Sequence, residues 1–403
     1  MNSITLVIWM CVCLSQGRLS KTKLPEARLH DDILGINKYV RPVSDITKPV
    51  NVRLRLFLLS IIELNERKGT MSSSIWLDLR WFDEQLAWNT SKYSGLETSR
   101  VPFTSIWTPD ILLRNEIGNK KGMKHTNFVD PTVRYTGEVI WWPGKEINTK
   151  CKIDTTKYPF DEQVCTLCVG KWYSDDSKVN ITTTSSKINI MYYEESEEWE
   201  LLDTSVELDT RLEALLEFSI NLFRVKIKRR SAFFMMNIVL PVLLMSFLNQ
   251  LCFVLPLESG EKIGMCMAIF LTFAVFLSLV GNSLPQSSVH MPAYCVYLVF
   301  QTILGILTIS SEVFILRVYN NSCWDDSTLR RFAFTVAPCL GIPLANNIKS
   351  TEEDNVDLPT CKSKGYGEEI CRKVAIKLDI VCGWVMLACN LAFTTGFFFF
   401  VNT

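Results

Sequence analysis

Long apolar runs and alternating polar stretches divide this chain into two halves. Four runs of mostly apolar residues occupy positions 233–255, 263–284, 293–316 and 374–401. A helix rises about 1.5 Å per residue, so the second run spans roughly 33 Å, enough for the hydrocarbon core of a bilayer. The pattern predicts a four-helix transmembrane bundle, with three helices within residues 231–316 and a cytoplasmic loop at 317–373 before the fourth.

Residues 18–230 instead alternate between apolar and polar side chains, as strands with one buried face do. The predicted inward residues are Val52, Leu54, Leu56 and Leu58 in one segment, and Ile75, Leu77, Leu79 and Trp81 in another. Asp78 and Arg80 should point the other way. A short helix at 24–35 and further strands at 138–142, 187–193 and 218–227 are expected, with turns at Thr108-Pro109-Asp110 and Trp142-Pro143-Gly144. The pattern predicts an all-β sandwich of the immunoglobulin-like kind.

The first 17 residues form a candidate signal peptide, because their apolar stretch at 4–14 is too short to span a membrane. Cleavage there would place residues 18–230 outside the cell, and four spans would return the C-terminus to the same side. The basic run at 226–230 would then lie outside, but large domains cross largely regardless of charge. Glycosylation sequons at Asn89 and Asn180 agree with this topology and with a plasma-membrane location.

Composition narrows the function further. The chain has 42 basic and 42 acidic residues, so its zero net charge gives no electrostatic reason to bind nucleic acid. It has 3 histidines and no spacing typical of a metal site or a catalytic nucleophile, so we expect no metal, no cofactor and no enzyme activity. Of its 14 cysteines, Cys151, Cys165 and Cys168 fall in the predicted extracellular part, where one disulfide is the economical interpretation.

The segment between Cys151 and Cys165 is the most specific signal in the sequence. It places thirteen residues between two cysteines, around Tyr158-Pro159-Phe160-Asp161. This segment resembles the signature loop of the Cys-loop pentameric ligand-gated ion channels. The resemblance continues in order through Trp76-Leu77-Asp78-Leu79-Arg80-Trp81 with Trp88, Trp107-Thr108-Pro109-Asp110-Ile111, Gly170-Lys171-Trp172, Leu240-Pro241 and Ser259-Gly260-Glu261-Lys262-Ile263. The last motif is similar to the cation-selective, nicotinic-acetylcholine-like branch.

The resemblance implies a Cys151–Cys165 disulfide, worth roughly 3 kcal/mol for a loop of about fifteen residues, and leaves Cys168 as a buried thiol. The apolar tip of this loop is unfavourable in water, so we expect it to pack against the membrane helices. The residues expected to couple ligand binding to the pore are Glu66, Tyr158, Pro159, Phe160, Asp161, Arg229 and Pro285. Arg229 should pair with a carboxylate of these loops. Alternatively, residues 228–230 anchor lipid headgroups.

By the same resemblance, the second apolar run lines the channel. Glu258, Glu261 and Lys262 would lie at its inner mouth. The lining residues would be Gly264, Ala268, Leu271, Val275 and Ser278, with Asn282 at the outer mouth, all on one helical face because of their spacing. Gly264 and Ala268 replace hydroxyl residues and Asn282 replaces an acid of the nicotinic pattern, which predicts weaker conduction. The alternative is an apolar helix that faces lipid.

The family binds agonist between subunits, in a box of aromatic side chains that holds an ammonium by cation–π attraction. The matching positions are Trp172 on the principal face and Trp76 on the complementary face, with Trp107 as a third candidate. Each tryptophan, taken alone, could instead belong to the core. A tryptophan on both faces permits a homopentamer around a central pore, although a heteropentamer stays open.

The rest of this box differs from the nicotinic pattern. Arg114 stands where the family has a tyrosine, and residues 203–217 contain no aromatic residue and no cysteine. Glu213 and Glu217 would lie there on a helical turn, because Ala214-Leu215-Leu216 favours helix. We therefore expect a small extracellular ligand with an anionic or zwitterionic group in place of acetylcholine. The alternative is that Arg114 is a solvated surface charge.

These observations predict a subunit of a pentameric ligand-gated cation channel, with both termini outside and a postsynaptic location in keeping with the family. Its partners would be the ligand, permeant cations and membrane lipid. The alternative is an accessory or silent subunit that assembles without binding agonist or conducting well.

Overall fold

The computed structural model describes residues 24–118, 129–213, 216–283, 291–320, 327–342 and 362–402, which form two compact units. One unit comprises Met1–Lys152, Val164–Ser196 and Leu201–Lys226, and the other comprises Ile153–Gln163, Glu197–Glu200 and Ile227–Thr403. The loop between the two cysteines of the signature motif therefore belongs to the same unit as the membrane helices.

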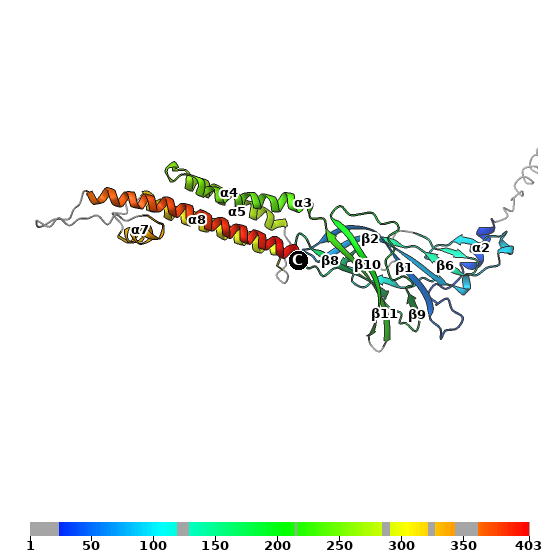
Figure 1. Ribbon diagram of the computed structural model, residues 1–403. Helices are drawn as coiled ribbons and strands as arrows, with labels where there is room; N and C mark the ends of the chain where they lie inside the picture. Colours follow the sequence, from blue (N-terminus) through cyan, green and yellow to red (C-terminus); the bar gives the residue numbers. More distant parts are fainter. Residues whose placement is uncertain are drawn as a thin grey trace, which may run out of the picture. The chain divides into compact units, whose positions relative to one another are not determined.

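The first unit is a β-sandwich that begins with α2 (Pro25–Ile33). Its strands are β1 (Val50–Asn65), β2 (Thr70–Phe82), β3 (Thr98–Arg100), β4 (Ile111–Leu113), β5 (Thr132–Arg134), β6 (Glu138–Trp141), β7 (Gly144–Lys150), β8 (Glu162–Lys171), β9 (Val179–Thr182), β10 (Trp199–Glu213) and β11 (Leu216–Arg229), with short 3₁₀ helices η1 (Glu84–Leu86) and η2 (Thr90–Tyr93). Among the described strands, one sheet has the order β3-β5-β6-β2-β1-β9, with β7 also paired to β2, and the other has the order β10-β11-β8-β4. Figure 1 labels β1, β2, β6 and β9 of the first sheet and β8, β10 and β11 of the second. The predicted sandwich is confirmed.

Strands β1 and β2 show why the alternating sequence folds this way. They pair antiparallel, and the predicted inward residues of both strands are at most 2 % exposed. Each fully buried aliphatic side chain of this size contributes about 1.5–3 kcal/mol. Asp78 faces the other way and is nevertheless 2 % exposed. Its carboxylate accepts hydrogen bonds from Arg55 (3.0 Å), Arg80 (3.0 Å) and the indole of Trp142 (2.9 Å), so alternation alone underestimated its burial.

The predicted turn at Trp142-Pro143-Gly144 is wrong. Strands β6 and β7 both pair antiparallel with β2, so the chain continues in the same direction through this interruption. Proline has no backbone N–H and breaks the ladder locally. Its carbonyl still accepts a hydrogen bond of 2.9 Å from the Leu77 nitrogen, which keeps the two segments aligned.

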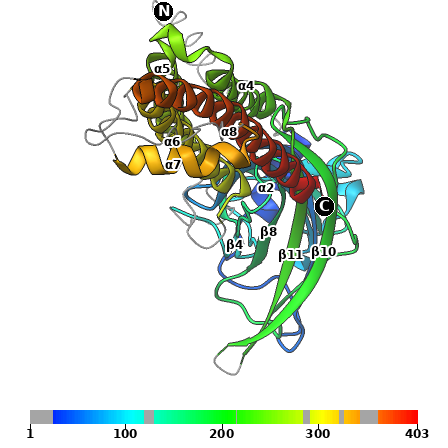
Figure 2. The ribbon, with the colours of Figure 1, turned by 60° about the vertical axis from the view of Figure 1, so that its left-hand side comes forward.

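Two other local predictions are also wrong. Residues 187–193 form no strand: Asn189 makes one isolated bridge to Phe57 of β1, and its side chain accepts a hydrogen bond from the Met191 nitrogen (2.9 Å). Such local bonds compete with a strand ladder. The helical turn expected near Glu213 and Glu217 is a hairpin, in which β10 ends at Glu213 and β11 begins at Leu216 (Figure 2). Strand pairing there outweighs the weak helix preference of the sequence.

The second unit is mainly helical. Its helices are α3 (Ala232–Phe234), the π-helical turn η4 (Met235–Val239), α4 (Leu240–Leu251), η5 (Cys252–Val254), η6 (Leu257–Ser259), α5 (Lys262–Ser283), α6 (Ala293–Asn320), α7 (Ser327–Cys339) and α8 (Lys362–Asn402). Within the described residues, four helical stretches are long and apolar enough to cross a membrane, namely Ala232–Val254, Lys262–Gly281, Ala293–Asn320 and Glu368–Val401. The prediction of four such helices is confirmed, and α7 adds a helix inside the predicted cytoplasmic loop.

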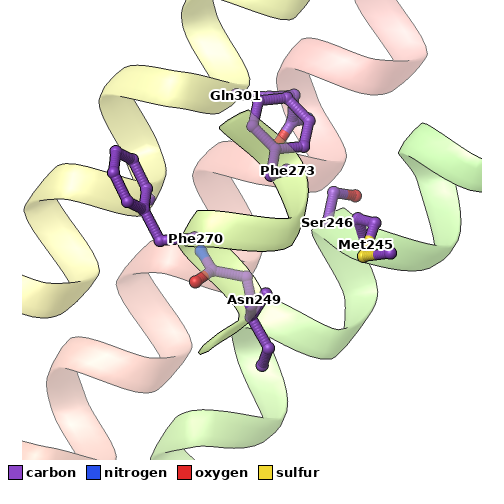
Figure 3. Close-up of a pocket in the computed structure, with 8 residues that line it drawn as sticks. Met245, Ser246, Asn249, Phe270, Phe273 and Gln301 are labelled. Atoms are coloured by element: carbon purple, nitrogen blue, oxygen red, sulfur yellow. The ribbon is translucent and has the colours of Figure 1, made fainter. Parts of the chain in front are cut away.

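Buried amides and hydroxyls join helices α4, α6 and α8. Asn249 donates to the Thr308 hydroxyl (3.1 Å), Gln301 donates to Asn390 (2.9 Å), and Asn390 donates to the Ser246 hydroxyl (3.3 Å). An unsatisfied polar group in hydrocarbon costs several kcal/mol, so these bonds fix how the helices face one another. A cavity of about 20 Å³, room for about one water, lies between α4, α5 and α6 (Figure 3).

Candidate functional site

Trp76 lies on the outward side of β2 and is 44 % exposed. Its indole lies across Gly144 of β7, because a Cβ atom at Gly144 would come within 2.1 Å of Trp76 Cδ1. The ring of Tyr192 lies 5.9 Å away, between ring centroids. Trp76 is therefore a surface residue whose orientation depends on a neighbouring glycine and a neighbouring aromatic ring.

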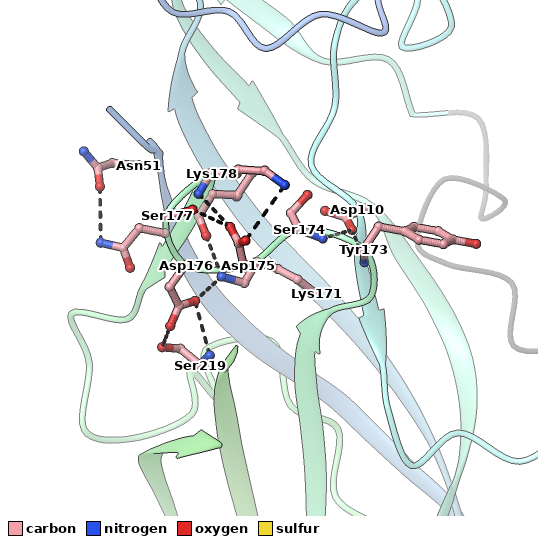
Figure 4. Close-up of polar contacts among 12 residues, drawn as sticks. Asn51, Asp110, Lys171, Tyr173, Ser174, Asp175, Asp176, Ser177, Lys178 and Ser219 are labelled. Carbon is pink, nitrogen blue, oxygen red and sulfur yellow. Dashed lines mark hydrogen bonds and ion pairs between the residues drawn. The ribbon is translucent and has the colours of Figure 1, made fainter. Parts of the chain in front are cut away.

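Trp172 directly follows β8 and is 49 % exposed. The Asp110 carboxylate accepts hydrogen bonds from the backbone nitrogens of Tyr173 (2.8 Å) and Ser174 (3.2 Å), which fixes the chain just after Trp172 (Figure 4). Trp172 extends from the sheet that contains β8, whereas Trp76 lies on the sheet that contains β2. The core interpretation is thus excluded for both tryptophans, and each sheet presents one of them to the surface.

A buried lysine next to Trp172 was missed in the sequence. Lys171 is fully buried, and its ammonium donates to the Asp176 carboxylate and to the Val179 carbonyl (Figure 4). Asp176 also accepts from the hydroxyl (2.6 Å) and the nitrogen (3.2 Å) of Ser219 on β11. Burial alone would raise the pKa of Asp176, but hydrogen bonds from Lys171 and Ser219 lower that pKa below its ordinary value. The cluster ties β8, the loop after it and β11 together.

The signal for this cluster was present in β8. The inward positions of this strand continue as Cys165, Leu167 and Val169, so strict alternation places Lys171 inward as well. A lysine in such a series needs a buried acidic partner. The sequence did not reveal which acid supplies it.

Arg114 shares the outer face of its sheet with Trp172. Leu112 of β4 lies opposite Gly170 of β8, and the Arg114 nitrogen donates to the Cys168 carbonyl (2.8 Å). Alternation places Arg114, Gly170 and Trp172 on one face, and a Cβ atom at Gly170 would lie 3.4 Å from Arg114 Cδ. Arg114 is half-buried, which argues against a fully solvated surface charge.

Trp107 has a different environment. It packs edge-on against the buried Trp81, with ring centroids 6.0 Å apart, and it is half-buried. Its contact with the core favours a structural role over contact with a ligand. Glu213 and Glu217 lie near the ends of β10 and β11, and their side chains lie outside the described part of the chain.

The predicted disulfide joins Cys151 and Cys165, with Cα atoms 5.0 Å apart. Cys168, predicted to be a buried thiol, is only half-buried. The apolar tip of the loop packs as expected, because Tyr158 is 2 % exposed within a cluster that includes residues of α4, α5, α6 and α8. Its ring lies 5.3 Å from that of Phe234, and Phe160 packs against the same cluster.

Arg229, the last residue of β11, lies beside the same loop, within the second unit, and its side chain is 1 % exposed. Its guanidinium donates to both carboxylate oxygens of Asp161 (2.8 and 3.3 Å) and to Glu198 (3.1 Å). Its Cζ lies 4.2 Å from the ring centroid of Trp199 and 5.0 Å from that of Tyr158. The expected pairing with a loop carboxylate is present, and headgroup anchoring is excluded for Arg229.

The same loop contacts the start of α6. The Thr156 carbonyl accepts a hydrogen bond from the nitrogen of Ala293, the first residue of α6, at 3.0 Å. The first N–H groups of a helix have no partner within the helix, so the loop supplies one here. This contact was not foreseen. Pro285, expected to couple from the neighbouring segment, lies outside the described residues, and Glu66 lies in the turn between β1 and β2.

Helix α5 has one buried face and one exposed face. The buried side chains are Lys262, Cys266, Phe273 and Val280. The exposed residues include Glu261, Gly264, Ala268, Leu271, Val275 and Ser278, which are the predicted pore-lining positions within the described part of this helix. The side chain of Asn282 lies outside that part. Glu258 is exposed and accepts a hydrogen bond from the Tyr319 hydroxyl (3.2 Å).

Lys262 does not lie with Glu261 at an exposed mouth, as the sequence had suggested. Its side chain is 0 % exposed and points into the helix bundle, where it pairs with Glu312 of α6 and Asp379 of α8. Neither acid was identified from the sequence. The third and fourth apolar runs each contain one of these acids, and ionisable groups in a membrane span are costly unless paired. This sequence feature could have predicted that Glu312 and Asp379 have a basic partner.

The two sequons occupy different surroundings. Asn89 is exposed at the start of η2, and its side chain accepts a hydrogen bond from the Ser91 nitrogen (3.0 Å). Asn180 is half-buried on β9 and donates to the Asn51 side chain (3.3 Å). Asn89 is the more accessible of the two.

Comparison with known proteins identifies the class. Residues 26–231 match the neurotransmitter-gated ion-channel ligand binding domain, and residues 238–342 match the neurotransmitter-gated ion-channel transmembrane region. The chain therefore belongs to the neurotransmitter-gated, or Cys-loop, family of ion channels, as its signature loop indicated. It is a nicotinic-like, multi-pass membrane protein of a channel family and not an enzyme.

The relatives are acetylcholine receptor subunits. Neuronal acetylcholine receptor subunit alpha-3 of Bos taurus is 34% identical over 72% of this chain and 58% of the relative. Subunit alpha-6 of Rattus norvegicus is 31% identical over 78% and 64%, and acetylcholine receptor subunit beta-like 1 of Drosophila melanogaster is 34% identical over 72% and 56%. The chain thus matches between 56% and 64% of the length of these relatives.

Proposed function

We propose that this chain is a subunit of a pentameric, cation-selective channel whose pore is lined by the exposed face of α5. The observation that carries the proposal is that face itself, where small and polar side chains alternate with apolar ones such as Leu271 and Val275, next to an exposed Glu261 directly before the helix. Among the described residues of one subunit this face stays exposed, so an assembly of subunits can bring five copies around a shared axis. Both termini and the β-sandwich lie outside the cell in this proposal, with glycans at Asn89 and Asn180.

Five Glu261 carboxylates would attract cations. At about 5 Å from an axial cation, each contributes roughly 0.8 kcal/mol even at the dielectric of water, so the ring contributes about 4 kcal/mol before screening. That is enough to enrich cations and exclude anions. Five Leu271 side chains would form an apolar collar that closes the path by dewetting.

The ligand would bind between neighbouring subunits, where Trp172 of one copy and Trp76 of the next can meet. Arg114 shares a face with Trp172, and its positive charge would repel a quaternary ammonium. The hairpin of β10 and β11 brings no aromatic residue between positions 203 and 217 to enclose such a cation. We therefore infer an anionic or zwitterionic ligand in place of acetylcholine.

Two substitutions test this function. Glu261→Gln should lower the cation-to-anion permeability ratio measured from reversal potentials, with Glu258→Gln as a weaker control because Glu258 is hydrogen-bonded to Tyr319. A ratio unchanged by Glu261→Gln would remove the selectivity argument. Arg114→Tyr should raise the affinity for cationic amines, and an unchanged ligand profile would contradict a role for Arg114 in the site.

The lack of aromatic residues and cysteines at positions 203–217 in the hairpin of β10 and β11 also favours a second candidate function. This candidate is an accessory subunit that assembles with others without binding agonist. Expression of this chain alone, followed by imaging of the oligomer and recording with amines, amino acids and changes of pH, separates the two. A five-fold particle that is silent to every ligand supports the accessory function, whereas a monomer contradicts both.

A further inference from the structure

Three ionisable side chains meet in the interior of the membrane-spanning unit. The ammonium of Lys262, the first residue of α5, lies 2.6 Å from both carboxylate oxygens of Asp379 on α8. It also lies 3.1 Å from a carboxylate oxygen of Glu312 on α6. The side chains of Lys262 and Glu312 are 0 % exposed and that of Asp379 is 8 % exposed. The cluster therefore holds one positive group and two acids away from solvent.

The two acids interact with Lys262 in different ways. Asp379 accepts two hydrogen bonds from Lys262, whereas Glu312 makes no hydrogen bond within the described residues and faces the ammonium only as a nearby charge. The Lys262 ammonium also lies 5.9 Å from the ring centroid of Phe253, a further favourable contact. Loss of one acid still leaves the lysine an acidic partner, but loss of both Glu312 and Asp379 leaves it no acidic partner within the described residues.

The residue before Lys262 is the exposed Glu261. A lysine has a flexible four-carbon stem, and an unpaired ammonium moves to the nearest water that its stem can reach. If α5 lines a pore, the nearest water at this level is the pore at Glu261. Five ammonium groups that arrive there would cancel the five Glu261 carboxylates.

We propose that Glu312 and Asp379 determine the charge selectivity of the channel, because they hold the Lys262 charge inside each subunit. This inference rests on the proposed cation pore and names two residues that never touch the permeant ion. They act by positioning Lys262, on helices that do not line the proposed pore. The ion preference of α5 thus depends on acids carried by α6 and α8.

The test is a charge-removal series in a channel that opens without a known ligand. A Leu271→Thr background should supply constitutive current, because a polar collar stays wet. In that background we expect the cation-to-anion permeability ratio to fall slightly with Glu312→Gln, more with Asp379→Asn, and by about tenfold with both. Adding Lys262→Met to the double variant should restore the ratio, since the stranded charge is then gone.

The outcomes separate this inference from the function on which it rests. If Glu261→Gln leaves the permeability ratio unchanged, or if the Leu271→Thr background carries no current, the proposed function fails. If Glu261→Gln changes the ratio while the double variant does not, or if Lys262→Met fails to restore it, the role of Glu312 and Asp379 is overturned. Should the double variant not reach the cell surface, Lys262→Met must return it there. A triple variant that is still absent from the surface contradicts the proposal.

Discussion

The outward faces of α5 and α8 are built from different kinds of side chain. The exposed positions of α5 combine small or polar residues (Gly264, Ala268, Thr272 and Ser278) with Met267, Leu271, Val275 and Leu279, next to the exposed Glu261, and no aromatic side chain is exposed on its described part. The exposed positions of α8 also include small residues such as Ala388, Thr395 and Gly396, but they carry the aromatic rings of Trp384, Phe399 and Phe400 and the branched side chains of Ile376, Ile380, Val381, Val385 and Leu391. Lipid tails favour large apolar groups, whereas small and polar groups suit a hydrated path. The proposed pore assigns α5 to water and α8 to lipid, and this difference in exposed side chains is consistent with that assignment.

The largest effect is expected from a substitution of Arg229, whose loss should disturb the fold that positions both α5 and α8. Arg229→Ala removes the partner of a buried Asp161 and should destabilise the fold by about 3–5 kcal/mol, so that neither helix face is presented correctly. Surface expression and the melting temperature of the purified protein measure this loss. Lys228→Ala, at an exposed neighbouring position, is the matched control and should change little. Normal assembly of Arg229→Ala would show that the contacts of Arg229 with Asp161 and Glu198 are dispensable.

An aspartate placed on each face tests the comparison itself. Val275 on α5 and Val385 on α8 are about equally exposed, at 55% and 54%. Val385→Asp should cost about 2.5–3.5 kcal/mol of membrane insertion and reduce expression sharply, because the charge would enter lipid. Val275→Asp should be tolerated, since five-fold assembly would place it in water. Equal loss of expression for both variants would mean that both faces contact lipid.

A smaller effect is expected at the apolar collar. Leu271→Thr makes the collar easier to wet by about 1 kcal/mol per subunit, so current should flow without agonist. Leu391→Thr on α8 is the control, because Leu391 is also more than half exposed. It should leave the channel closed at rest. Leak current that is the same in the two variants would contradict a hydrophobic gate at Leu271.

The smallest effect should come from the β-sandwich, where acid protonates the Asp176 carboxylate. The pKa of Asp176 is lowered, so its charged form stabilises the folded state above the ordinary carboxylate range, and this contribution is lost as the pH falls through the folded pKa. The melting temperature of the full chain should therefore fall in acid, and less steeply for Asp176→Asn. Asp203→Asn is the control, because the exposed pair of Asp203 with Lys187 contributes little.

Much of the fold was readable from local patterns. The alternation in β1 and β2 identified the core side of both strands, since a strand with one buried face repeats every two residues. Four apolar runs gave four membrane helices, because length and composition alone decide whether a helix can span a bilayer. Proline at position 143 and asparagine at 189 misled the prediction, since the outcome at each depends on pairing with a strand distant in the sequence.

Only part of the candidate site could be predicted from the sequence, because the remaining contacts depend on how distant segments pack. The exposed face of α5 and the pairing of Arg229 with a loop carboxylate followed from the family resemblance, but the sequence did not single out Asp161 as that partner. The partners of Lys171 and Lys262 did not. Asp176 lies only five positions after Lys171, but in a loop where no strand period indicates which side chain points inward. The acids that pair with Lys262 lie on helices far along the chain. Asp379 lies 117 positions after Lys262, and nothing in the local sequence connects the two. Long-range charge pairs of this kind need the assembled fold.

The central claim is that the exposed faces of five α5 helices line a water-filled pore. A density map of the protein assembled in a lipid bilayer tests this claim most directly. The account predicts five copies about an axis, with Leu271 and Glu261 directed toward that axis and Trp384 of α8 directed toward lipid. A map in which Leu271 and Glu261 contact acyl chains, or in which another helix lines the axis, would contradict it.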